Sequence, residues 1–229
     1  MWLPAPQPGR HRMLDVGCGD GAGMQAAKRL GWFPDGCEVN EEACAGARQR
    51  GFRCFGGDWE GQLPKDSYDM VLLSHVLEHL EDPLRALRTL RGTLRPGGAL
   101  LIGMPNLDSS LGRAFGEAWI ANAVPEHLWH LTYAHVLKMV ANAGYNVCDT
   151  RRQSAIRGTL APQIWWRQWQ FASGQHWSGT RIAGAFLRGG LRYVRSCLDK
   201  NVLPAGEGFG FALLCEAKDD ASEARQKTL

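Results

Sequence analysis

Short β-like runs alternate with helical segments from Arg12 onward, and this alternation restricts the chain to a small set of folds. Consecutive parallel strands must be joined by a crossover of a dozen or more residues, and that crossover is usually a helix. We therefore expect βαβ units that stack into a parallel sheet. The predicted strands lie near Met13–Val16, Asp35–Val39, Arg53–Phe55, Tyr68–Ser74, Ala99–Met104, Tyr145–Thr150 and Phe209–Ala217.

Two helices have clear boundaries in the sequence. Asp82 and Pro83 supply an N-cap and a first-turn proline for the first helix. Its apolar stripe consists of Leu84, Leu87, Leu90 and Leu94. This stripe predicts a helix that continues through its last leucine and is stopped by the Arg-Pro-Gly-Gly segment at 95–98. Thr132 is the predicted cap of the second helix, and Gly144 is its predicted terminator.

Length and composition set further bounds. The 229 residues suffice for the core of one medium domain, so we predict a single domain over residues 1–229. A formal net charge of +3 does not by itself indicate a nucleic-acid partner. The seven cysteines form no C-x-x-C pair, which favours a reducing compartment over a disulfide framework. Because no signal pattern or membrane-spanning run occurs in this sequence, we expect a cytoplasmic protein, at most attached to a membrane surface.

A glycine-rich turn follows the first predicted strand, within the segment Met13–Gly21. Glycines let the backbone approach a ligand closely, and the start of the following helix offers amide groups. Gly17, Gly19 and Ala22 also satisfy the loose G-x-G-x-x-G/A pattern, so a nicotinamide-binding enzyme is a rival interpretation at this point. No Gly-Lys-Ser/Thr follows the turn, which excludes a phosphate-binding P-loop.

Carboxylates follow the next two predicted strands. Glu38 lies about twenty residues after the turn, where a carboxylate can accept both ribose hydroxyls of a nucleoside. Asp58 can accept the amino group of an adenine while Trp59 covers the face of the ring. This arrangement suits an adenosyl ligand that carries no pyrophosphate.

Five segments occur in the order seen in small-molecule methyltransferases. They are Asp15–Gly21, Tyr68–Val71, Glu78–Leu80, Leu94–Gly98 and Pro105–Asn106. Over Met13–Thr150 the chain resembles class I S-adenosylmethionine-dependent methyltransferases, in the group that includes ubiquinone-type O-methyltransferases and bacterial glycan or lipid methyltransferases. The resemblance implies an α/β fold, with a Rossmann-like, seven-stranded, mainly parallel sheet, helices on both faces and an antiparallel last strand. It also implies S-adenosylmethionine as the methyl donor.

The same resemblance implies a set of cofactor-binding residues. The predicted set is Asp15, Gly17, Cys18, Gly19, Glu38, Asp58, Trp59 and Ser74. Gly17 and Gly19 are expected against the methionine part, and Glu38 is expected at the ribose. Ser74 would contact the methionine amino group through its backbone. The alternative for Trp59 is a surface tryptophan that binds no ligand.

Candidate catalytic residues gather just after the fourth predicted strand, where open α/β sheets place their ligand crevice. In the similar ubiquinone-type enzymes this region has two acidic residues and a histidine that can hold a divalent cation. Here His75 stands at the first acidic position, while Glu78 and His79 match. One carboxylate and two imidazoles suit magnesium poorly, so we predict no metal and assign Glu78 and His79 to catalysis. The alternative is that they only cap and brace the following helix.

A second candidate segment, Pro125–Tyr133, precedes the helix before the sixth predicted strand. Similar methyltransferases often carry a His-Leu pair here that faces the acceptor. His127 is therefore predicted to act as a base or to orient the acceptor, since an imidazole can exchange a proton near neutral pH. His130 and Tyr133 can instead be ordinary packed side chains.

An insertion at about 154–205 precedes the last predicted strand and is both aromatic and basic. Its tryptophans are Trp165, Trp166, Trp169 and Trp177. One narrow sector of a helical wheel holds Arg181, Arg188, Arg192 and Arg195, opposite Ile182 and Phe186. Gly184, Gly189 and Gly190 weaken this helix, so we expect it to be short or to form only on contact.

The arginine stripe has two interpretations. It suits contact through residues 160–198 with an anionic membrane surface or with a phosphate-bearing, lipid-linked acceptor. Alternatively, it is a solvated face on a helix that covers the active site, with the tryptophans packed beneath. No RNA-binding motif accompanies the stripe, so we do not expect a nucleic-acid partner.

The predicted function is methyl transfer from S-adenosylmethionine to a small-molecule or lipid-linked acceptor, at oxygen. The alternative is a non-catalytic methyltransferase-fold protein that binds the cofactor or a partner without turnover. The glycine turn with Glu38 and Asp58 argues against lost cofactor binding, but no single residue establishes catalysis.

Overall fold

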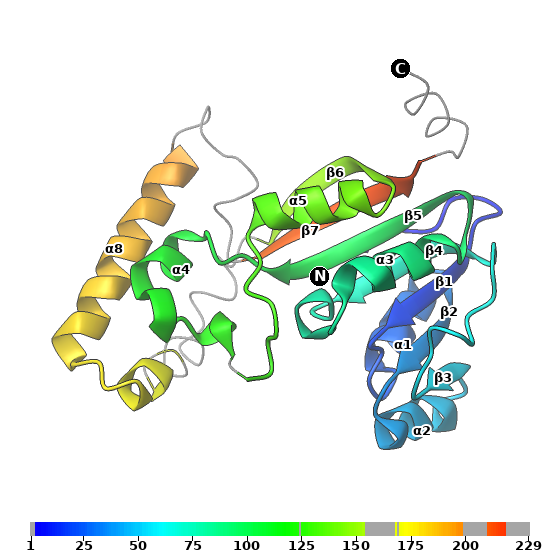
Figure 1. The fold of residues 1–229 in the computed structure, drawn as a ribbon, viewed down its shortest axis with the longest axis horizontal. Coiled ribbons are helices and arrows are strands. Elements are labelled where there is room, and N and C mark those ends of the chain that lie inside the picture. The colour runs from blue at the N-terminus through cyan, green and yellow to red at the C-terminus, as the bar shows by residue number, and fades with distance from the viewer. Residues whose placement is uncertain (1–2, 124, 154–167, 169, 199–209, 219–229) are drawn as a thin grey trace. The chain divides into compact units, whose positions relative to one another are not determined.

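The computed structural model describes residues 3–123, 125–153, 168, 170–198 and 210–218 (Figure 1). Its strands are β1 (Arg12–Val16), β2 (Phe33–Glu38), β3 (Cys54–Gly56), β4 (Tyr68–Ser74), β5 (Leu94–Pro105), β6 (Tyr145–Gln153) and β7 (Gly210–Ala217). Its α-helices are α1 (Ala22–Arg29), α2 (Glu41–Gln49), α3 (Pro83–Arg91), α4 (Ser110–Phe115), α5 (Tyr133–Asn142) and α8 (Gly179–Leu198). Short 3-10 helices are η1 (Leu77–His79), η2 (Gly116–Ala118) and η3 (Ile120–Asn122).

The chain divides into two compact units. The first unit comprises Met1–Gly103, Lys138–Asp149 and Leu213–Leu229. The second unit comprises Met104–Leu137 and Thr150–Ala212. The single domain with an insertion at about 154–205 stays a prediction, and residues 154–167, 169 and 199–205 of that segment lie outside the described residues.

The seven strands form one sheet in the order β3-β2-β1-β4-β5-β7-β6. Parallel pairing joins β3 to β2, β2 to β1, β1 to β4 and β4 to β5. β7 is antiparallel, as the arrowheads in Figure 1 show. The Rossmann-like, mainly parallel sheet predicted from the sequence is therefore confirmed. The strand order reverses between β1 and β4, and open α/β sheets bind their ligands at such a switch point.

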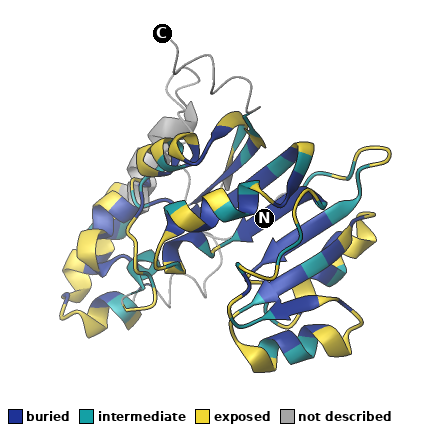
Figure 2. Ribbon diagram, turned by 45° about the vertical axis from the view of Figure 1, so that its right-hand side comes forward, coloured by how far each residue is buried: buried dark blue, intermediate teal, exposed yellow. Residues whose placement is uncertain are grey.

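The parallel strands carry nearly continuous apolar runs because both of their faces are covered. In β4 every residue from Tyr68 to Leu73 is buried (Figure 2). In β1 the side chains of Met13 and Leu14 have no exposed surface. α1 packs against β2, and α2 packs against both β2 and β3. This covered sheet holds the loops at the carboxyl ends of its strands in place.

The helix predicted to reach Leu94 ends earlier, so this part of the sequence prediction was wrong. α3 stops at Arg91 with Gly92 as its C-cap, and Leu94 is the first residue of β5. There Leu94 pairs with Tyr68 of β4, and the Arg-Pro-Gly-Gly segment at 95–98 is an irregularity inside the strand. Leu94 is buried, and a buried leucine satisfies a helical stripe and a strand equally well.

The other predicted helix boundaries are confirmed. The side chain of Asp82 accepts a hydrogen bond from the N–H of Arg85 at 2.9 Å, which caps α3. The Thr132 hydroxyl oxygen accepts one from the N–H of His135 at 3.3 Å, which caps α5. Gly144 follows α5 with a left-handed φ of 85°, as a glycine terminator should.

Helix α8 is longer than its three glycines led us to expect. It runs for 20 residues, and its inner face is buried against α4. Ile182 and Ala185 have no exposed surface, while Phe115 of α4 stacks on Trp177 with ring centroids 5.9 Å apart. Tertiary burial of this face outweighs the cost of about 1 kcal/mol that each glycine imposes on a helix. Within the described residues, no helix is long and apolar enough to cross a membrane.

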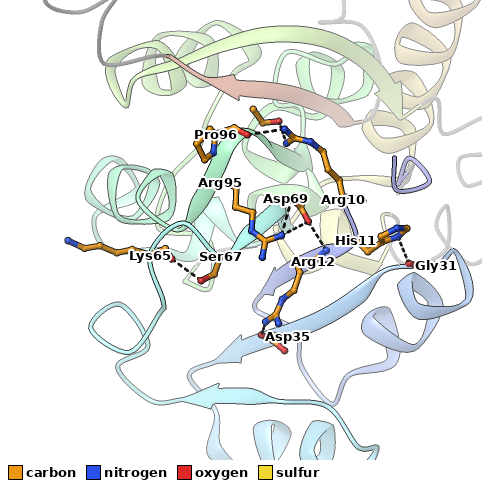
Figure 3. Close-up of polar contacts among 11 residues, drawn as sticks. Arg10, His11, Arg12, Gly31, Asp35, Lys65, Ser67, Asp69, Arg95 and Pro96 are labelled. Atoms are coloured by element: carbon orange, nitrogen blue, oxygen red, sulfur yellow. Dashed lines mark hydrogen bonds and ion pairs between the residues drawn. The ribbon is translucent and has the colours of Figure 1, made fainter. Parts of the chain in front are cut away.

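A charged network joins the amino ends of the parallel strands (Figure 3). Asp69 of β4 accepts a hydrogen bond from the N–H of Arg12 at 2.9 Å and lies 3.3 Å from Nη1 of Arg95. The guanidinium of Arg12 pairs with Asp35 of β2 at 2.7 Å. These contacts tie β1, β2, β4 and β5 together at the edge opposite the expected ligand crevice.

Candidate functional site

The loop between β1 and α1 is built on glycines with left-handed backbones. Gly17, Gly19 and Gly21 have φ values of 67°, 55° and 86°, a region that L side chains avoid. A Cβ on Gly17 would also lie 2.6 Å from Cγ2 of Val76, in the loop after β4. A Cβ on Gly19 would meet nothing within 4 Å, so this glycine borders open space.

The amide groups of this loop are directed toward β2. The N–H groups of Gly17 and Cys18 both donate to the carbonyl oxygen of Cys37, at 2.8 and 3.2 Å. The N–H of Gly19 donates to Oε2 of Glu38 at 2.9 Å. These bonds hold the glycine loop against the carboxyl end of β2.

Glu38 is held by two backbone amides at the end of β2. Besides Gly19, the N–H of Asn40 donates to Oε1 of Glu38 at 3.0 Å. Each carboxylate oxygen has more than one lone pair, so the fixed side chain can still accept hydroxyl donors. The position and the free acceptor capacity suit the predicted contact with a ribose.

A cavity of about 280 Å³ adjoins the loop. It is lined by Val16, Gly17, Cys37, Glu38, Val39, Trp59, His75, Val76, His79 and Leu80. The lining residues follow the carboxyl ends of β1, β2, β3 and β4, so the cavity lies at the switch point of the sheet. Three predicted cofactor-binding residues are brought together here, namely Gly17, Glu38 and Trp59.

A second cavity of about 350 Å³ shares part of this lining. Trp59 lines both cavities, whereas Asp58 lines only the second. The Asp58 side chain is exposed, and Trp59 is only 5% exposed. Trp59 is therefore not a surface side chain, while its contact with adenine stays a prediction.

Asp15 and Cys18, also predicted to bind the cofactor, are buried in the first unit and do not line the cavity. The Cys18 sulfur lies 3.6 Å from that of Cys54, within an apolar cluster. Burial raises the pKa of Asp15 to about 7, and the nearby charge of Glu38 contributes. Any contact of these two residues with a ligand stays a prediction.

The electrostatics of the site favour a cation over a phosphate. Two carboxyl groups, those of Asp15 and Glu38, lie close enough for the charge of one to affect the other's ionisation. The successive amides that a pyrophosphate would need are already donated to protein oxygens. The rival dinucleotide interpretation is thus disfavoured, whereas a positively charged ligand gains from the carboxylate of Glu38, which lines the cavity.

The loop after β4 has an unusual backbone. His75 follows Ser74 directly, has a left-handed φ of 57°, and lines the cavity with a half-exposed side chain. Glu78 in η1 is 1% exposed, and its Oε1 lies 3.5 Å from Nδ1 of His75. His79 lines both cavities. The sequence prediction assigned Glu78 and His79 to catalysis and noted His75 at the first acidic position of the motif without giving it a catalytic role.

His127 lies in the second unit. Its Nδ1 is 2.7 Å from the carbonyl oxygen of Ala121. Because a carbonyl oxygen only accepts, Nδ1 carries the proton, and in the neutral ring Nε2 holds the lone pair. Nε2 of His130 contacts a backbone carbonyl oxygen at 3.0 Å, and Tyr133 packs edge-on against Phe211. His127 is therefore in the tautomer that a base at Nε2 requires.

The sheet order, the antiparallel β7 and the glycine loop with its carboxylate are features of the Rossmann-like class I methyltransferase fold. The chain belongs to the family of methyltransferase domains, which matches residues 2–150. The match includes every residue that lines the first cavity.

The individual proteins to which the chain is similar are also named as methyltransferases. The chain is 28% identical over 152 residues to the ubiquinone biosynthesis O-methyltransferase of Aeromonas salmonicida, covering 60% of this chain and 64% of that protein. It is 30% identical over 166 residues to the enzyme of the same name from Cereibacter sphaeroides, covering 65% and 66%. The chain thus spans somewhat less than two thirds of these relatives. The crystal structure of an S-adenosylmethionine-dependent methyltransferase from Mesorhizobium loti shares the fold, with a TM-score of 0.58, 19% identity and 93% of both chains covered.

The residues at the switch point fit S-adenosylmethionine. The open space beside Gly19 accommodates a ligand without displacing a side chain. Glu38 keeps acceptor capacity for ribose hydroxyls, and the buried face of Trp59 adjoins the same cavity. The carboxylate of Glu38 suits a ligand with a sulfonium and an ammonium group.

We predict that Asp15 makes the protein less stable as the pH rises from about 4 to about 7. Asp15 keeps its proton in the folded state up to about pH 7 but ionises near pH 3.8 when unfolded, so the folded state binds more protons in this window. The lost free energy of unfolding is about 4 kcal/mol.

Urea unfolding of wild type and Asp15→Asn between pH 4 and pH 7 checks this prediction. In the asparagine variant, the free energy of unfolding should fall less steeply with pH, because the contribution of Asp15 is missing. Asp66→Asn, at an exposed position whose left-handed backbone tolerates asparagine, is the control. Identical slopes in wild type and Asp15→Asn would contradict the prediction.

Proposed function

We propose that this chain transfers a methyl group from S-adenosylmethionine to a small-molecule or lipid-linked acceptor, at an oxygen atom. The observation that carries the proposal is Glu38, fixed by two backbone amides beside an open, glycine-lined cavity at the switch point of the sheet. The relatives named ubiquinone biosynthesis O-methyltransferases support oxygen as the receiving atom.

The chemistry of the cofactor determines which tasks are left to the protein. S-adenosylmethionine supplies an activated methyl group on a sulfonium, so the protein has to bind, orient and exclude water. We assign the ribose to Glu38, the adenine to Asp58 and Trp59, and the methionine part to Gly17 and Gly19. The remaining predicted contacts are Asp15, Cys18 and the backbone of Ser74.

The acceptor side is assigned to residues after β4 and before α5. Glu78 and His79 follow β4, and His79 lines the cavity. His127 belongs to the second unit, and its Nδ1 bond to Ala121 leaves the lone pair on Nε2. We assign His127 to contact with the acceptor hydroxyl, as a group that orients it or accepts its proton.

Calorimetric titration with S-adenosylmethionine, S-adenosylhomocysteine and NAD tests the proposed cofactor site. Binding of the two adenosyl ligands alone is expected. Gly19→Val should lower the affinity for S-adenosylhomocysteine by about 100-fold or more, because the valine fills the space beside the loop. Gly116→Val is the matched control, since Gly116 has the same φ of 55° and equally open surroundings. Equal affinities in the two variants would refute the site. If wild type bound none of the three ligands, a non-catalytic protein would be favoured.

His127→Ala should leave the affinity for S-adenosylhomocysteine unchanged and lower kcat by about 100-fold, the usual contribution of a group that handles the acceptor proton or orientation. Calorimetry and turnover with catechol-type and quinol-type acceptors check this. A parallel loss of cofactor affinity and turnover would show that His127 has only a structural role.

We propose further that residues 160–198 contact an anionic membrane surface when the acceptor is lipid-linked. Within the described part of this segment, Arg181 stacks on Trp177 at 3.8 Å, and Arg188 is exposed on α8. Trp177 is buried in the second unit, whereas Trp165, Trp166 and Trp169 lie outside the described residues. Arg188 is thus a cation available to lipid headgroups.

Flotation with vesicles of phosphatidylcholine and phosphatidylserine tests the membrane contact. Arg188→Glu should reduce the bound fraction several-fold, because each basic residue near an anionic surface contributes about 1 kcal/mol. Arg29→Glu makes the same charge change at an exposed position on α1. A bound fraction that does not depend on the phosphatidylserine content of the vesicles would refute the contact.

A further inference from the structure

We propose that His75 is the base that accepts the proton of the methyl-acceptor hydroxyl, and that Glu78 acts through it as a positioning residue. This inference rests on the proposed O-methyl transfer and deepens it. It leaves His127 the role of orienting the acceptor.

The backbone of His75 is the first observation. Its φ of 57° is left-handed, a conformation that non-glycine residues rarely adopt and that clusters at functional sites. The His75 N–H extends the β4–β5 ladder with a 2.8 Å bond to the carbonyl oxygen of Gly103. The chain therefore leaves β4 abruptly, and His75 lines the cavity that Gly17 and Glu38 also line.

The buried carboxylate of Glu78 is the second observation. Glu78 is 1% exposed, and among the described residues neither of its oxygens has a hydrogen-bond partner. Burying such a group costs free energy unless a charge or donor compensates it. Its Oε1 lies 3.5 Å from Nδ1 of His75, and catalytic hydrogen bonds in ligand-free structures are often long and tighten on binding. His75 thus offers this carboxylate a ring nitrogen that can donate to it once the two groups approach.

The pair has the arrangement of a carboxylate-histidine dyad. A carboxylate at Nδ1 selects the tautomer with the proton there, and Nε2 then holds the lone pair of the base. In the reaction, the acceptor oxygen bonds to the methyl carbon as the carbon–sulfur bond breaks and its electron pair stays on sulfur. The hydroxyl proton moves to Nε2 of His75 and then to water, while Glu78 balances the imidazolium charge.

Charged and titratable groups near His75 come from η1 and β2. Glu78 faces it from η1, and Glu38 of β2 and His79 of η1 line the same cavity. A pH profile alone therefore cannot be ascribed to His75. The test consequently compares acceptors of different acidity and includes a readout that needs no turnover.

His75→Asn is the variant of choice. Asparagine tolerates a left-handed backbone, and its amide can donate to Glu78 but cannot act as a base. His176→Asn is the matched control, because His176 is an exposed histidine with a φ of 61° and does not line the cavity. The control separates the cost of the substitution from the loss of the base.

Carbethoxylation by diethyl pyrocarbonate, read by peptide mass spectrometry, provides the readout without turnover. Saturating S-adenosylhomocysteine should slow labelling of His75 by about fivefold or more because it occupies the adjoining cavity. Labelling of His176 should not change. Undiminished labelling of His75, with S-adenosylhomocysteine shown by calorimetry to be bound, would overturn the proposal.

Turnover with catechol and 4-nitrocatechol tests the base directly. His75→Asn should lower kcat with catechol by about 100-fold but kcat with 4-nitrocatechol by less than about tenfold, because the latter is already ionised at pH 8. Added imidazole should restore part of the catechol rate. Glu78→Gln should also lower kcat more with catechol than with 4-nitrocatechol, but to a smaller degree. His127→Ala should lower kcat equally with both acceptors.

The outcomes separate this proposal from the proposed function. An equal loss with both acceptors in His75→Asn would overturn the base assignment and leave methyl transfer intact. Absence of S-adenosylhomocysteine binding in wild type would instead refute the proposed function. Wild type that binds S-adenosylhomocysteine but methylates neither phenol would refute transfer to phenolic oxygen, and the base assignment would fall with it.

Discussion

The glycine loop after β1 is bonded to the carboxyl end of β2, and the cofactor side of the site depends on this contact. Two amides converge on the Cys37 carbonyl oxygen, and the Gly19 amide reaches the Glu38 carboxylate. The loop can approach β2 this closely because its glycines have left-handed backbones. The same bonds occupy the amides that a pyrophosphate would need, so one set of contacts both shapes the cavity and selects against a dinucleotide.

The opposite side of the cavity is built on a different principle. β4 is buried along almost its whole length and ends at Ser74, after which the chain turns sharply at His75. Glu78 is buried after this turn, and its Oε1 lies 3.5 Å from Nδ1 of His75. A rigid strand end thus carries a strained residue and a buried charge, both of which the surrounding fold must stabilise. We infer that the acid–base chemistry is located here because the sheet can hold these groups in place.

Sequence patterns predicted the sheet well where local and tertiary preferences agree. The predicted strands correspond to β1 through β7, and the caps at Asp82, Thr132 and Gly144 are confirmed. The misses occur where tertiary contacts override local propensity. Leu94 was assigned to a helix but pairs with Tyr68 in the sheet. α8 was expected to be short, yet burial of its face against α4 maintains it.

The sequence by itself determined the fold class and the glycine loop, because these follow from periodicity and from residues that are adjacent in the chain. Its motifs also carried the resemblance to the family. Only the tertiary structure decided which side chains share the cavity, because burial and distance depend on segments far apart in the chain. It placed Glu38 and Trp59 at one cavity and Asp58 at the next, and directed the Cys18 side chain toward Cys54. It also revealed the pairing of His75 with a buried carboxylate, since no sequence pattern reports a backbone dihedral angle or the solvation of a charge.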